Sequence, residues 1–284
     1  MPLTAEILKI DAEDVKRRIV RFIRDYVERS GANGVVLGLS GGLDSSTAAA
    51  LCSLALGGDR VLGLIMPERE TYRPVDVEHA RMVAEKFGIP VEEVDLTRIL
   101  EAYWASLPVY EPRDRVSNGN LKARVRMTVL YYYANRLNRL VCGTSDKSEA
   151  MVGYFTKWGD GAADIEPIMD LYKTQVRQLA RHIGVPKEIV EKPPAPNLWP
   201  GQLAEEELGI RYEVLDLILY GLEHFMTPRE VVREVNVPVE LVEMVLRRWR
   251  ASEHKRRVPP CVKLEYRTVG MDFRLPHLTE TKGG

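Results

Sequence analysis

Short apolar runs alternate with longer amphipathic segments through the first half of the chain. Strands are predicted at the apolar runs, which cover residues 35–39, 61–66, 91–94 and 140–143, the first with a buried-strand pattern. Helices are predicted before and between them, over residues 12–29, 47–56, 75–87, 98–107 and 121–137. Regular alternation of strand and helix predicts an α/β fold, a doubly wound parallel sheet flanked by helices.

The last third of the chain has a helical pattern. Thr227, Pro228 and Glu230 form a helix-start signal, and Pro238 opens a second amphipathic helix over 239–250. Polar, glycine- or proline-rich segments predict a mobile loop at 109–120 and ordered loops over the site at 153–164 and 192–201.

We expect a single domain spanning residues 1–284. Its nucleotide-binding α/β core would cover about 12–190, and a loop and helical C-terminal part about 191–258. The remaining residues, 259–284, are expected to form a loosely structured tail.

The strand at 35–39 leads through two glycines and an acid directly toward a helix. Gly41 and Gly42 allow close backbone approach to a ligand, and the helix N-terminus presents free N–H donors. This predicts a phosphate-binding turn. The turn lacks the lysine of a Walker loop and carries Asp44 instead, and a carboxylate beside phosphates indicates a bridging Mg²⁺. A plain structural turn, with Asp44 near a helix N-terminus, is the alternative.

Composition excludes several classes of function. The net charge of −1 disfavours a large nucleic-acid-binding face. The three cysteines, at positions 52, 142 and 261, lack metal-ligand spacing. No signal peptide and no apolar stretch of about 18 residues is present, so we expect no membrane contact and a cytoplasmic location.

The run Ser40-Gly-Gly-Leu-Asp-Ser45 resembles the S-G-G-x-D-S signature of the ATP pyrophosphatases, which release pyrophosphate from ATP while adenylating a substrate. Further segments, together with the spacing from 164 to Lys173, resemble the ammonia-dependent NAD synthetases: N-L-K-A-R-V-R-M at 120–127, G-T-S-D-K-S-E at 143–149 and G-Y-F-T-K-W-G-D-G-A-A-D at 153–164. The resemblance covers roughly residues 15–258.

The resemblance implies adenylation of the nicotinate carboxylate of deamido-NAD by ATP, followed by displacement of AMP by ammonia. Adenylation makes chemical sense because it gives a poor electrophile a good leaving group. Asp44, Glu149 and Lys173 would act in catalysis, with Asp44 and Glu149 binding Mg²⁺. The implied ATP-binding residues are Gly38, Leu39, Ser40, Gly41, Gly42, Leu43, Asp44, Ser45, Thr144, Lys173 and the position of Ala195. Taken alone, Glu149 also fits a helix-start carboxylate, and Lys173 a solvated lysine.

The implied deamido-NAD contacts lie further along the chain. They are Arg124, Lys157, Asp164, His254 and Lys255, with Asp160 as a further candidate. The family builds this site across a two-fold interface, which implies a homodimer with Arg124 supplied by the neighbouring subunit. The helix at 121–137, with its tyrosines 131–133, is the candidate contact surface, although core packing explains those tyrosines equally well. His254 and Lys255 also fit a solvent-facing helix end.

One segment departs from the family pattern. Where Lys-x-Pro-Thr/Ser-Ala-Asp-Leu is usual, this chain has Lys192-Pro-Pro-Ala195-Pro-Asn197-Leu198, so a hydroxyl expected to reach ATP is missing. Two other classes of function stay open: an ATP pyrophosphatase with another acceptor, GMP-synthetase-like or tRNA-modifying, and a non-enzymatic adenine-nucleotide sensor. Metal-dependent pyrophosphate release separates enzyme from sensor.

Overall fold

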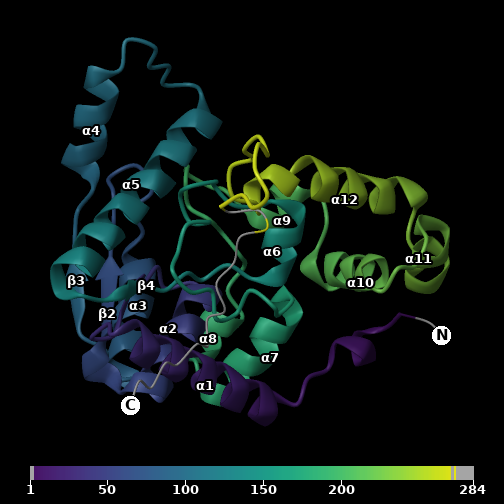
Figure 1. The fold of residues 1–284 in the computed structure, drawn as a ribbon, viewed down its shortest axis with the longest axis horizontal. Helices are drawn as coiled ribbons and strands as arrows, with labels where there is room; N and C mark the ends of the chain where they lie inside the picture. The colour runs from purple at the N-terminus through teal and green to yellow at the C-terminus, as the bar shows by residue number, and fades with distance from the viewer. Residues whose placement is uncertain (1–2, 270–271, 273–284) are drawn as a thin grey trace.

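A parallel sheet of four strands forms the centre of the α/β half of the molecule (Figure 1). The computed structural model describes residues 3–269 and 272. The strands are β1 (Val35–Gly38), β2 (Val61–Ile65), β3 (Val91–Glu93) and β4 (Leu140–Val141), in the order β3-β2-β1-β4. Because the chain builds outward from β1 to β3 and then returns to the other side of β1, the strand order reverses between β1 and β4. Ligands of open α/β sheets bind at such a switch point, beyond the carboxyl ends of the strands.

Helices cover both faces of the sheet, and the alternation of side chains in β1 explains why. Val35 and Leu37 point into a core shared with helices on one face, and Val36 points into a core shared with a helix on the other. The first face carries α1 (Ala12–Ser30), α2 (Leu43–Leu56), α3 (Pro74–Lys86), α7 (Lys173–Ile183) and α8 (Lys187–Val190). The second carries α5 (Arg115–Leu137), beside which α4 (Thr97–Ser106) packs through a smaller cluster. The alternating pattern therefore predicted the fold class correctly.

Two of the cysteines meet inside the first core. The Sγ atoms of Cys52 on α2 and Cys142 after β4 lie 3.6 Å apart, and both side chains are buried. Cysteines that the sequence separates widely are therefore neighbours in the fold.

A second hydrophobic core joins the C-terminal helices to α6 (Lys147–Val152). These helices are α9 (Ala204–Leu208), α10 (Tyr212–Glu223), α11 (Pro228–Val235) and α12 (Val239–Ala251), and Figure 1 shows α10–α12 standing to one side of the sheet. The predicted start of α11 is confirmed, since Thr227 and Glu230 form a reciprocal capping box. Short 3₁₀ helices complete the set: η1 (Ala5–Leu8), η2 (Gly58–Arg60) and η3 (Glu253–Lys255).

Two predicted boundaries were wrong. Helix α2 begins at Leu43 and not at 47, so Asp44 lies in its first turn. The positive end of the helix dipole stabilises a carboxylate at this position. Helix α5 begins at Arg115, which places half of the predicted loop 109–120 in a helix. Asp114 caps it by accepting a hydrogen bond from the Ser117 N–H. Gly119 suggested a loop but lies inside the helix, where it packs closely: a Cβ there would sit 3.1 Å from Leu198 Cβ.

The predicted tail is described only in part. Residues 259–269 and 272 contain no helix, as expected, and residues 270–271 and 273–284 lie outside the described residues. Within the described chain, every helix is too short or too polar to cross a bilayer.

Candidate functional site

The glycine-rich turn after β1 is held against helix α3. Gly41 has a left-handed φ of 71°, and a Cβ at this position would lie 2.2 Å from the Asp76 carbonyl oxygen. Only glycine meets both conditions without strain. Ser40 and Ser45 close the turn from inside, with their hydroxyl oxygens 2.9 Å apart, and the Gly42 N–H donates to the Ser40 hydroxyl at 3.3 Å. The turn is therefore a compact, preformed loop at the N-terminus of α2.

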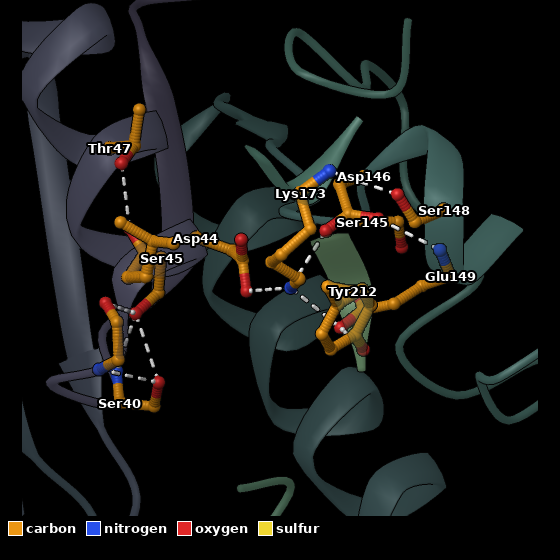
Figure 2. A network of polar contacts seen from close by, with 12 residues as sticks. Ser40, Asp44, Ser45, Thr47, Ser145, Asp146, Ser148, Glu149, Lys173 and Tyr212 are labelled. Carbon is orange, nitrogen blue, oxygen red and sulfur yellow. Dashed lines mark hydrogen bonds and ion pairs between the residues drawn. The ribbon is translucent and has the colours of Figure 1, made fainter. Parts of the chain in front are cut away.

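A buried lysine lies at the centre of three carboxylates facing this turn (Figure 2). Lys173, at the start of α7, places its ammonium 2.7 Å from an oxygen of Asp44, of Asp146 and of Glu149. Its side chain is 1% exposed and that of Asp146 is 0% exposed. Figure 2 shows Asp44 reaching in from α2, opposite Glu149 and Tyr212. We call Lys173 and these three acids the charged centre.

Burial and neighbouring charges shift the pKa values of groups in the charged centre. Burial opposes the charged form of Lys173, but the three carboxylates together raise its pKa well above the ordinary value. Burial likewise raises the pKa of Glu149 and of Asp146, with the lysine acting in the opposite direction. With all groups ionised, three negative charges face one positive charge, so the centre attracts a further cation.

Residues from the second core hold the charged centre in place. Asp216 on α10 accepts hydrogen bonds from the Ser148 hydroxyl at 2.5 Å and from the Thr174 N–H at 2.9 Å. Tyr212 donates to Glu149 at 3.3 Å. Burial raises the pKa of Asp216 to about 7. The C-terminal helices therefore fix the first turns of both α6 and α7.

A cavity of about 340 Å³ opens between the turn, the charged centre and the inner face of α5. Almost all of the predicted ATP and metal residues line it: Gly38, Leu39, Ser40, Gly42, Leu43, Asp44, Ser45, Thr144, Glu149, Lys173 and Ala195. Gly41 is not among the lining residues, because it is packed against α3. Met66, Met127 and Leu130 add an apolar wall. The cavity lining thus combines polar and apolar side chains.

The acids of the charged centre fit a divalent cation. Ligand oxygens of Asp44, Asp146 and Glu149 lie within 4.8 Å of one another. Asp44 Oδ1 is buried without a hydrogen-bond partner, whereas its Oδ2 contacts Lys173. Asp44 and Glu149 line the cavity, while Asp146 lies behind them and caps α6 through the Glu149 N–H. Hard oxygen ligands of this kind suit Mg²⁺.

The predicted deamido-NAD residues form a separate group outside the cavity. Arg124 Nε donates to the Lys157 carbonyl at 3.2 Å, on the outer side of α5. Asp164 accepts from Tyr131 at 3.2 Å and from the Val141 N–H at 2.7 Å, and burial raises the pKa of Tyr131 to about 12. These residues are absent from the cavity lining. The predicted ATP and metal residues and the predicted deamido-NAD residues therefore form two separate groups.

Two positions near the C-terminal end of α12 behave differently from each other. Lys255 donates to the carbonyls of Gly153 and Phe155, both at 2.7 Å, and so fastens the loop at 153–164. Burial lowers the pKa of Lys255. His254 is exposed. Asp160, in the fastened loop, lines the cavity and accepts from the Thr156 N–H at 2.9 Å.

Sequence reasoning missed several residues of the site. Asp146 was read only as part of a motif, although it completes the carboxylate set. Arg126 lines the cavity, and burial lowers the pKa of its guanidinium. An arginine two positions after Arg124 lies on a different side of a helix, which is the signal that could have assigned it to the inner face. Asp216 and Tyr212 carried no local signal, since they come from a distant helix.

Comparisons with known proteins agree on one family. A family model described as NAD synthase matches residues 15–259. The chain is 55% identical over 250 residues to the NH₃-dependent NAD⁺ synthetase of Methanocaldococcus jannaschii, covering 87% of this chain and 96% of that protein.

Solved structures give the same result for the fold. An NMN synthetase from Francisella tularensis matches with a TM-score of 0.80 and 33% identity, over 90% of this chain and all of that one. An NH₃-dependent NAD synthetase from Campylobacter jejuni matches with a TM-score of 0.76 and 30% identity, over 89% of this chain and all of that one.

Proposed function

The chain belongs to the NAD synthase family, and we propose that it amidates deamido-NAD to NAD with ammonia, using ATP and releasing AMP and pyrophosphate. The charged centre beside the glycine-rich turn is the observation that carries the proposal. Its acids can hold a metal ion against phosphates that the backbone of the turn binds. A nucleotide sensor has no need of such a centre, and the family disfavours other acceptors.

ATP would occupy the cavity with its base toward the apolar wall and its phosphates at the turn. The N–H groups of the turn and the first turn of α2 would donate to phosphate oxygens, which the helix dipole also stabilises. Asp44 and Glu149 would hold Mg²⁺, which supplies charge neutralisation for phosphoryl oxygens when bound. Lys173 donates to both of these carboxylates, and Thr144 also lines the cavity.

The dinucleotide acceptor would extend from the cavity to the outer group of residues. Arg124 and Lys157 offer cations for its phosphates or carboxylate, and Asp164 offers acceptors for hydroxyls. Because Arg124 lies at the surface of α5, with Lys157 in the adjoining loop, we propose that a second copy of the chain completes this subsite in a homodimer. Tyr132, which is 70% exposed on α5, provides apolar area for that contact.

Adenylation places a good leaving group on the nicotinate carbon, and ammonia then displaces AMP. The residues of this chain contribute by orienting the carboxylate toward the α-phosphorus and by excluding water from the cavity. Asp160 lies at the cavity wall, and we propose that it binds the incoming ammonium ion and accepts its proton.

The test is a reaction of purified protein with ATP, Mg²⁺, acceptor and ammonium, with chromatography of NAD, AMP and pyrophosphate. We expect NAD and AMP in equal amounts, and neither when Mg²⁺ is chelated. Glutamine replaces ammonium in a parallel reaction and should give no NAD. Bound ATP without NAD formation from any nitrogen source would contradict the proposal.

Nicotinate mononucleotide is the second acceptor to test, because the Francisella neighbour is an NMN synthetase. The outer group of residues favours the dinucleotide, since the shorter acceptor would leave part of it unused. We therefore expect a higher kcat/KM for deamido-NAD. The reverse order would assign the chain to mononucleotide amidation.

A further inference from the structure

The proline-rich loop at 192–201 forms a wall of the cavity next to the glycine-rich turn. Residues 192–198 all line the cavity. The loop contains four prolines, at 193, 194, 196 and 200, and these restrict its backbone. The Ala195 side chain has no hydrogen-bonding group to offer a nucleotide.

Three residues fasten this loop to the turn. Lys192 Nζ donates to the Gly41 carbonyl at 3.2 Å and to Asp76 Oδ1, and the side chains of Lys192 and Asp76 are each 14% exposed. Asn197 Nδ2 donates to Asp76 Oδ2 at 2.9 Å. One carboxylate oxygen of Asp76 therefore accepts from Lys192 and the other from Asn197, at the two ends of the segment 192–197. We call Asp76, Lys192 and Asn197 the loop clamp.

The identity of residue 197 matters for this arrangement. Asn197 has a left-handed φ of 52°, which Asn and Asp tolerate better than most residues. An aspartate would keep that backbone but bring a second carboxylate against Asp76. The Asn197 amide instead donates a hydrogen bond to a carboxylate. Such a bond is stronger than one between two neutral groups.

Further contacts support the loop from its other side. Buried Lys122 on α5 donates to the Leu198 carbonyl at 3.0 Å while paired with Glu68 at 2.7 Å. The Ala204 N–H donates to the Pro194 carbonyl at 3.0 Å. The clamp therefore acts on a loop whose remaining freedom is small, and it sets the position of the loop relative to the turn.

We propose that Asn197 is a positioning residue which, through the loop clamp, builds the nucleotide-binding wall before ATP arrives. Preorganisation lowers the ordering cost of binding and offsets the contact that Ala195 does not make. The proposal rests on the proposed use of the cavity for ATP. It assigns to Asn197 and Asp76 a role in nucleotide binding without direct contact with the reacting atoms.

The decisive variant is Asn197→Asp, which replaces the donor amide with a second carboxylate. We expect it to raise the Kd of a non-hydrolysable ATP analogue, measured by calorimetry, and the KM for ATP by about tenfold. kcat and the KM for deamido-NAD should stay within about twofold, because the acceptor subsite is untouched. Asn236→Asp makes the same substitution at an exposed left-handed helix end, with a φ of 59°, and controls for the added charge.

The double variant Asp76→Asn/Asn197→Asp exchanges donor and acceptor while keeping the charge of the clamp. It should recover most of the lost affinity, as expected for directly coupled residues. Thermal unfolding of each variant verifies that it is folded.

Wild-type affinity in Asn197→Asp would overturn the proposal, and so would a loss that the exchange does not recover. If the wild-type protein makes no NAD while the analogue binds with the expected pattern, the clamp stands and the proposed function fails.

Discussion

Replacing Lys173 with methionine tests whether the charged centre is held together by its single cation. Methionine keeps the length and apolar volume of the side chain and removes the ammonium that contacts all three acids. Breaking a buried ion pair by removing one partner costs about 3–5 kcal/mol, because the remaining charge is left uncompensated. We expect Lys173→Met to lose about that much stability.

The loss converts into a measurable shift of the melting temperature. With 284 residues and about 2.1 cal/mol/K per residue, the unfolding entropy is about 0.6 kcal/mol/K. A destabilisation of about 3–5 kcal/mol then lowers Tm by about 5–8 °C. Added Mg²⁺ at about 100 times its Kd would return about 2.7 kcal/mol, or about 4–5 °C, if the three acids bind it.

Scanning calorimetry with a chelator and then with Mg²⁺ measures both effects. Lys187→Met is the matched control, since Lys187 is 82% exposed and its contact with Glu191 is 3.8 Å long. An ion pair of that kind contributes little, so the control should melt close to wild type. If Lys173→Met has the same Tm as Lys187→Met in the presence of chelator, the electrostatic account of the charged centre is refuted.

Three further variants test other parts of the site. Glu149→Gln removes a proposed metal ligand and should lower kcat/KM at least about 100-fold with little change in Tm, so full activity in Mg²⁺ would contradict the assignment. Ala195→Thr restores the missing hydroxyl and should tighten ATP binding by about 2–10-fold, whereas an unchanged Kd would show that this position makes no phosphate contact. Burial raises the pKa of Glu166 from 4.5 to about 8, so its burial disfavours folding increasingly as pH rises through that window. Relative to Glu166→Gln, the wild type should therefore lose stability between about pH 4.5 and pH 8 in denaturant titrations, and a constant difference would contradict this.

The sequence predicted the fold class because its signal is periodic and local. Strands and helices of the α/β half follow from the spacing of apolar residues, and the turn at Ser40–Ser45 follows from its glycines. The start of α5 was misplaced because Gly119 resembles a loop residue, although it lies inside the helix and packs closely against Leu198. The cap at Asp114 sets that boundary, and the sequence analysis did not recognise it.

The candidate site was predicted in its parts but not in its geometry. Asp44 and Glu149 were predicted as a pair, but no spacing rule indicated that Lys173 would contact both acids and also Asp146. Asp216 and Tyr212 come from a helix of the second core, so their role depends on how two cores pack. Such long-range contacts have no signature in a single sequence.

The anchoring of α6 and α7 by α10 also has a consequence for synthesis of the chain. Asp44 belongs to the first core, whereas Glu149 receives its hydrogen bond from Tyr212, and Asp216 fixes the backbone beside Lys173. A ribosome that has delivered only the α/β half has therefore made every charged group of the centre without the helix that orders them. The hydrogen bonds that order the charged centre can therefore form only after α10 has been made.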